Sequence, residues 1–66
     1  MNNMECIIMV RLDELNTLLK EVREVVKRTK SQSMKNFYMG RAVAICDEIK
    51  FLETTKLLLE NGEMNE

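Results

Sequence analysis

The sequence predicts an all-α fold: an antiparallel two-helix hairpin that self-associates into a helical bundle, either a four-helix dimer or a higher oligomer. Three observations predict it. Proline is absent and glycine occurs only twice, which disfavours turn-rich β folds. Two long segments carry apolar residues at alternating spacings of three and four. A short polar run separates these segments, at residues 27–35. The whole chain, residues 1–66, is predicted to be a single domain.

The first helix is predicted over about residues 5–29, after a frayed start at residues 1–4. Its apolar seam consists of Ile8, Leu12, Leu15, Leu19, Val22 and Val26. This spacing matches the a and d positions of a heptad repeat. Acidic residues are concentrated early in the segment and basic residues late, as the helix dipole favours.

The second helix is predicted over about residues 34–61, after a turn at about residues 30–33 and before a frayed tail at residues 62–66. Its seam consists of Tyr38, Ala42, Ile45, Ile49 and Leu52. Ser31 or Ser33 can accept a hydrogen bond from the first turn as N-cap. Gly62, after Asn61, can adopt the left-handed conformation that ends a helix. Gly40, Ala42 and Ala44 are small residues that would let a neighbouring helix approach closely.

A single continuous helix is the competing interpretation. It would place Thr29, Ser33 and Asp47 on the seam and so lose the apolar stripe. A fold-back near Gln32 restores the stripe, because the numbers of facing residues then add up to 64. The pairs that agree are Leu12 with Leu52, Leu15 with Ile49, Leu19 with Ile45, Val22 with Ala42, and Val26 with Tyr38.

One two-helix hairpin buries too little apolar surface to offset the entropy of ordering its chain. This sequence has additional apolar residues beside the seams, and they predict an interface. The expected interface residues are Ile7, Met9, Leu18, Val25, Phe37, Phe51 and Leu58. We expect a homo-oligomer; the alternative is a monomer whose apolar patch binds a different protein.

Residues 5–10 leave a second architecture open. An apolar run followed by Val10-Arg11-Leu12-Asp13-Glu14-Leu15 resembles the opening of ribbon–helix–helix repressors, in which a strand pairs across a dimer. The resemblance covers about ten residues and implies DNA binding through alternate residues of that strand. Those residues would be Glu5, Ile7, Met9 and Arg11, a set too apolar and acidic for DNA, so the hairpin is favoured.

Catalysis and metal binding are not expected. The chain has no histidine and no serine or cysteine beside a recognisable base. Cys6 and Cys46 would lie about 16 Å apart along the hairpin, which excludes a disulfide between them, and both are interpreted as packing residues. The acid pairs 13–14 and 47–48 are adjacent on helices and diverge. No Gly-rich phosphate loop occurs, and no cofactor is predicted.

The turn end is basic: residues 25–46 contain five basic residues and no acidic one. Lys35 lies in the first turn of the second helix, where the helix dipole favours an anion. The candidate anion or nucleotide site therefore consists of Lys30, Lys35, Arg41, Tyr38, Ser31 and Ser33. The simpler interpretation is a solvated turn.

The leading functional hypothesis is a small, non-catalytic protein that oligomerises and binds another macromolecule, as an adaptor or inhibitor of the phage or mobile-element type. The alternative is an anion binder whose basic turn end holds RNA or a small nucleotide between subunits. No run of about 20 apolar residues occurs, so no membrane partner is expected. No signal peptide is evident, and a cytoplasmic location with reduced thiols is expected.

Overall fold

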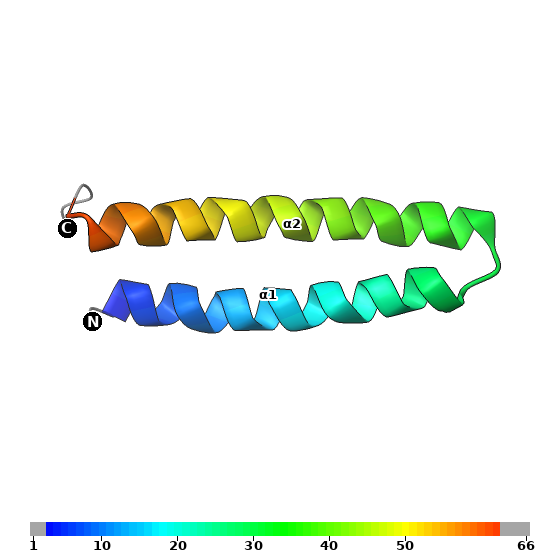
Figure 1. Cartoon of the computed structure of the whole chain (residues 1–66), viewed down its shortest axis with the longest axis horizontal. Helices are drawn as coiled ribbons and strands as arrows, with labels where there is room; N and C mark the ends of the chain where they lie inside the picture. Colours follow the sequence, from blue (N-terminus) through cyan, green and yellow to red (C-terminus); the bar gives the residue numbers. More distant parts are fainter. Residues whose placement is uncertain (1–2, 63–66) are drawn as a thin grey trace.

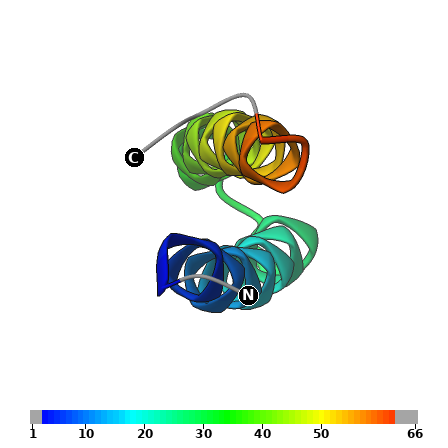
Figure 2. The ribbon, with the colours of Figure 1, turned by 90° about the vertical axis from the view of Figure 1, so that its left-hand side faces the viewer.

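The computed structural model describes residues 3–62 as two antiparallel α-helices (Figure 1). Helix α1 spans Asn3–Arg28 and helix α2 spans Gln32–Glu60. The helices lie side by side along their whole length, and a connection of three residues joins them at one end (Figure 1). Seen along the helices, the two form a single pair, so both flanks of their contact are open (Figure 2). The all-α hairpin is confirmed for the described residues.

Helix α1 includes residues 5–10, which the sequence left open between helix and strand. Residues 3–62 contain no strand, so the strand required by a ribbon–helix–helix fold is not formed. The helix begins at Asn3, two residues earlier than predicted. Of the frayed start predicted at residues 1–4, residues 3 and 4 are helical. Met1 and Asn2 lie outside the described residues, as do residues 63–66 of the predicted tail.

The turn occupies residues 29–31 and not 30–33, because Ser31 caps α2 and the helix starts directly after it. Ser31 has an extended backbone, and its hydroxyl accepts a hydrogen bond from the Met34 amide at 3.3 Å. The Ser31 amide in turn donates to Thr29 Oγ1 at 3.3 Å. Of the two serines predicted as caps, Ser31 is the N-cap, and Ser33 lies inside the helix.

The end of α2 follows the prediction. The Asn61 amide donates to the Leu57 carbonyl at 3.0 Å, and the Gly62 amide donates to the Leu59 carbonyl at 3.1 Å. Gly62 has a φ of 71°, which side chains with a Cβ rarely adopt. These bonds satisfy carbonyls that the helix leaves without an amide partner.

The core is one thin stripe between the helices. Its buried side chains are Ile8, Leu15, Leu19, Val22 and Ile45. Around the central cluster pack the half-buried residues Leu18, Tyr38, Ala42, Cys46, Ile49 and Leu52. The predicted seam residues Leu12 and Val26 are half-buried as well. The two seams therefore meet as predicted, but a pair of helices encloses few of their side chains completely.

The register of the two helices differs from the prediction by about one helical turn. Helix α1 ends at Arg28 and α2 begins at Gln32, and Arg11 of α1 forms an ion pair with Glu48 of α2. The numbers in these two pairs add up to 60 and 59, and not to 64. A seam with spacings of three and four presents apolar residues again after every turn, so sliding one helix by a turn preserves apolar pairing. The position of the turn selects among these registers, and the turn lies earlier than predicted.

Two smaller expectations need correction. Gly40 has no atom within 4 Å of where a Cβ would stand, so this glycine does not serve a close approach of α1. Cys46 is half-buried and packs against the core, as predicted for a packing residue, whereas Cys6 is exposed. Neither cysteine forms a disulfide within the described part of the chain.

Candidate interaction surface

A line of apolar residues runs along one flank of α2, outside the core. Phe37, Ala44, Phe51 and Leu58 recur every seven residues, which is close to two helical turns. Phe37 is 61% exposed and Phe51 is 68% exposed. Aromatic side chains bury more apolar area than most others when they are covered. A partner that covered this flank would therefore bury a large apolar area.

Helix α1 adds apolar residues to the same side of the hairpin. Leu18, Val25 and Phe37 line one hollow between the helices. Leu18 and Ala44 line the next hollow along the hairpin. Ile7 precedes Leu18 by eleven residues, close to three full turns, and so lies on the same side of α1. We call this surface the Phe face; its residues are Ile7, Leu18, Val25, Phe37, Ala44, Phe51 and Leu58.

The structure thus gathers six of the seven predicted interface residues on one side of the hairpin. The exception is Met9, which follows Ile7 by two residues and so projects about 200° away from it around α1. Met9 is exposed and lies on the side of α1 that carries Asn16, seven residues further on. It does not join the Phe face.

Charged groups cross the middle of the Phe face. Arg11 Nε of α1 lies 3.1 Å from Glu48 Oε2 of α2. Arg11 Nη1 also lies 3.8 Å from Glu14 Oε1, one turn further along α1. Arg41 lines both hollows of this face. The apolar surface is therefore divided into two parts by a polar centre.

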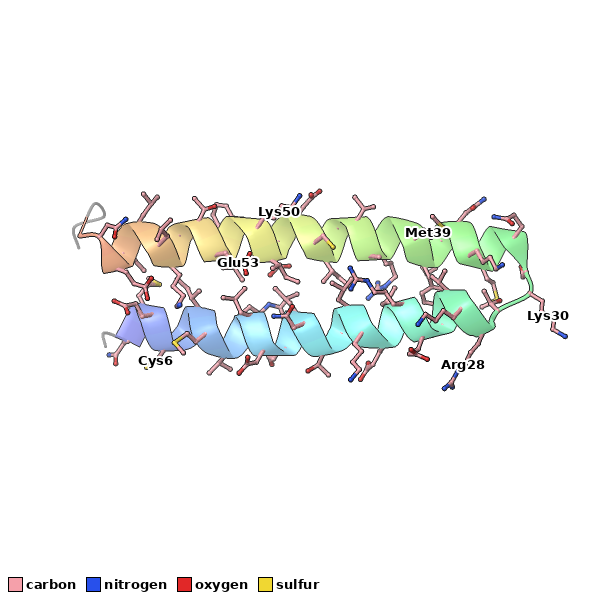
Figure 3. The ribbon with its side chains drawn as sticks, viewed as in Figure 1. Cys6, Arg28, Lys30, Met39, Lys50 and Glu53 are labelled. Atoms are coloured by element: carbon pink, nitrogen blue, oxygen red, sulfur yellow. The ribbon has the colours of Figure 1, made fainter. Side chains whose placement is uncertain are left out.

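The predicted anion-site residues are not gathered around one point. The Ser31 and Ser33 hydroxyls lie 3.3 Å apart, but the Ser31 hydroxyl caps α2. Lys30 projects beyond the turn, away from both helices (Figure 3).

The other three members of that set point in different directions. Tyr38 packs against the core and makes an edge-to-face contact with Phe37, with ring centroids 5.1 Å apart. Lys35 and Arg41 are six residues apart on α2, so they project about 120° from each other.

A different basic cluster lies on the side opposite the Phe face. Lys20, Arg23 and Lys27 of α1 line a hollow whose other residues include Met39 and Ala42 of α2. Lys35 precedes Met39 by one turn and shares its side of α2. We call Lys20, Arg23, Lys27 and Lys35 the basic hollow. Charges counted along the chain do not reveal this cluster, whereas the three-four spacing of Lys20, Arg23 and Lys27 on α1 does.

Glu24 lies beside this cluster and partly neutralises its positive charge. Lys27 Nζ lies 3.8 Å from Glu24 Oε1, and Arg28 Nη2 lies 3.8 Å from Glu24 Oε2. Arg28 points away from α2, on the outer side of α1 (Figure 3). Lys20 and Arg23 form no ion pair among residues 3–62, and both can meet an anion in solution.

Two other kinds of site are absent from the part of the chain that the structure describes. No group of three or more Cys, Asp or Glu residues lies close enough there to hold a metal ion. Neither of its two helices has a stretch long and apolar enough to cross a membrane.

Comparison of this chain with protein-family models, with curated proteins and with solved structures finds no match.

Proposed function

We propose that this chain is a non-catalytic interaction protein whose hairpins associate through the Phe face, and that the assembly binds another macromolecule as an adaptor or inhibitor. The observation that carries the proposal is the exposure of Phe37 and Phe51, at 61% and 68%, on one flank of a thin core. Exposed aromatic residues that line up beside a core are typical of protein interfaces.

The accessible surface supports association. The chain exposes 5136 Å². A compact monomer of its mass, 7.8 kDa, exposes about 4,400 Å². The excess is close to the roughly 800 Å² that each partner buries in a standard interface. An interface of standard size would therefore bring the exposed surface of each chain close to that of a compact monomer.

The chemistry of the chain supports a binding role over catalysis. The sequence has no histidine, the side chain most often used to transfer protons near neutral pH. A binding protein needs no such group. It needs an exposed surface that a partner can cover, such as the Phe face.

The mass of the protein in solution tests this proposal. Sedimentation or light scattering at high micromolar concentration should give a dimer or a larger species. Phe51→Asp places a charge on the Phe face and should shift the mass to the monomer. Val43→Asp is the matched control, since Val43 is 62% exposed and lies on α2 eight residues before Phe51, projecting about 80° away from it. A monomeric unmodified chain would contradict the proposal.

The basic hollow favours a second candidate function, binding of a phosphate-bearing ligand such as RNA. Three basic side chains surround a hollow with an apolar floor at Met39 and Ala42. Basic groups beside apolar surface suit both the backbone and the bases of a single strand. Of the residues first predicted for an anion site, Lys35 belongs to this cluster. Lys30 projects beyond the turn, and Arg41 lines the hollows of the Phe face.

Salt dependence tests the second candidate. Binding of a short single-stranded RNA should weaken steeply between about 50 mM and about 200 mM salt. Lys20→Glu combined with Lys27→Glu should abolish it. Lys50→Glu is the control, because Lys50 lies on the outer side of α2, away from α1 (Figure 3). If the RNA affinity changed neither with salt nor on the double substitution, this candidate function would be ruled out.

A further inference from the structure

We propose that the occupant of the Phe face is a second copy of the chain in antiparallel orientation. The turn half of each hairpin, residues 16–45, then lies against the open half of its partner, residues 3–15 and 46–62. This inference deepens the proposed function and rests on it. It specifies the orientation and register of the two copies, which association alone leaves open.

Charge selects the orientation. Residues 16–45 form the turn half of the hairpin and carry seven basic and two acidic residues, a net charge of +5. In the open half, residues 3–15 and 46–62 carry three basic and seven acidic residues, a net charge of −4. Two copies with their turns at the same end would place like charges together. Turning one copy end for end places +5 against −4, which is the complementary arrangement.

Side-chain size then fixes the register. In the antiparallel arrangement a two-fold axis runs across the Phe face, and α2 packs on the partner's α2. If the axis passes the middle of the line of four residues on α2, Phe37 faces the partner's Leu58, and Ala44 faces the partner's Phe51. The Phe51 ring of each copy is thus opposite Ala44, the smallest side chain of the line, so large and small residues interdigitate.

Helix α1 provides an independent check. The register within the hairpin, in which Arg28 ends α1 and Gln32 begins α2, carries the axis from the middle of the α2 line to the bond between residues 12 and 13 of α1. Leu18 of α1 then faces the partner's Ile7. These are the two apolar residues that α1 contributes to the middle of the Phe face, and neither of them enters the position of the axis.

The polar centre of the Phe face also fits. With the same axis, Arg11 faces the partner's Glu14. Arg11 already lies 3.8 Å from Glu14 of its own chain and 3.1 Å from Glu48. Near the axis its guanidinium can therefore be shared among three carboxylates, which compensates for the acids gathered there. A charged layer of this kind penalises other registers.

Distances between spin labels at the turn test the orientation. Cys6→Ser and Cys46→Ala remove the native thiols, and Lys30→Cys then provides one labelling site that projects beyond the turn. With the axis at the middle of the α2 line, the two labels should lie about 50 Å apart at 1.5 Å per residue. If the turns share one end, the labels should lie within about 20 Å, close to two helix diameters.

A second labelling site and a mass measurement keep the test decisive. Arg28→Cys, whose parent side chain is also solvent-exposed, should again give a long distance. A dimer with short distances at both sites would overturn the orientation and leave the proposed function intact. A monomer in the thiol-free parent, matched by a monomer in the unmodified chain, would overturn both.

Discussion

Arg11 of α1 joins α2 through Glu48, with Arg11 Nε 3.1 Å from Glu48 Oε2. The side chains are 47% and 44% exposed, so water and salt screen the pair. Such pairs contribute less than about 1 kcal/mol to stability. Within one hairpin the pair therefore shows how the two helices are aligned, and it contributes little to their stability.

A double-mutant cycle with Arg11→Ala and Glu48→Ala should therefore give a small coupling. We expect about 0.5 kcal/mol in the free energy of unfolding, measured by chemical denaturation under conditions that keep the protein monomeric. The coupling should decrease at high salt. A salt-insensitive coupling above about 2 kcal/mol would mean that the pair is buried.

Leu15 should dominate the stability of the core, since it is 1% exposed at the centre of the buried cluster. Leu15→Ala should lower the free energy of unfolding by about 3 kcal/mol, because it removes buried methyl groups and leaves a cavity. Leu57→Ala changes the same side chain at an exposed position of α2 and should cost far less. Thermal melts followed by circular dichroism compare the two variants. Equal losses would contradict the assigned core.

Ser31 should stabilise α2 through its hydroxyl. Ser31→Ala leaves the Met34 amide without its 3.3 Å acceptor and should cost about 1 kcal/mol. Ser33→Ala is the control: Ser33 lies in the first turn of α2, where alanine is a good helix former. Chemical denaturation of both variants gives the comparison. A larger loss at Ser33 than at Ser31 would show that the cap is misassigned.

Replacing each of the two glycines by alanine should change stability in opposite directions. Gly40→Ala adds a Cβ in open space inside a helix and should stabilise the protein by up to about 1 kcal/mol. Gly62→Ala forces a Cβ into a φ of 71° and should fray the end of α2. Amide hydrogen exchange at residues 57–61 reports the second effect. Faster exchange there in Gly40→Ala than in Gly62→Ala would refute this assignment.

Salt should weaken an antiparallel dimer. From about 0.01 M to about 1 M salt the Debye length falls from about 30 Å to about 3 Å, so attraction between the +5 and −4 halves fades. The dimer dissociation constant, measured by sedimentation equilibrium, should rise accordingly. Copies with both turns at one end repel each other, and for them the constant should fall instead.

The periodicity of the sequence was sufficient to predict both helices and the burial of Leu15, Leu19 and Val22, because a single partner helix covers one stripe. It was insufficient for the register, since a seam repeated every turn fits equally well after a slide of one turn. The cap at Ser31 resolves that degeneracy, and both serines were plausible caps in the sequence alone. The cap at Ser31 therefore determines the register of the two helices, which the apolar spacing alone left open.

The surfaces were predicted unevenly for a similar reason. The α2 residues of the Phe face follow a seven-residue spacing, which places them on one side of the helix. Met9 was grouped with them only because it is adjacent in sequence to other apolar residues, and the helix turns it away. The same effect hid the basic hollow, where Lys20 and Lys27 are separated along the chain by Glu21 and Glu24 but share one side of α1.

The connection Thr29–Ser31 contains neither proline nor glycine, and none of its residues has a positive φ. Right-handed helical backbone is therefore sterically open to all three of them. Opening the hairpin at this connection loses the contacts between α1 and α2, and a second opened copy can restore those contacts by supplying the missing helix. At high concentration two chains can therefore exchange helices and form the same core between chains.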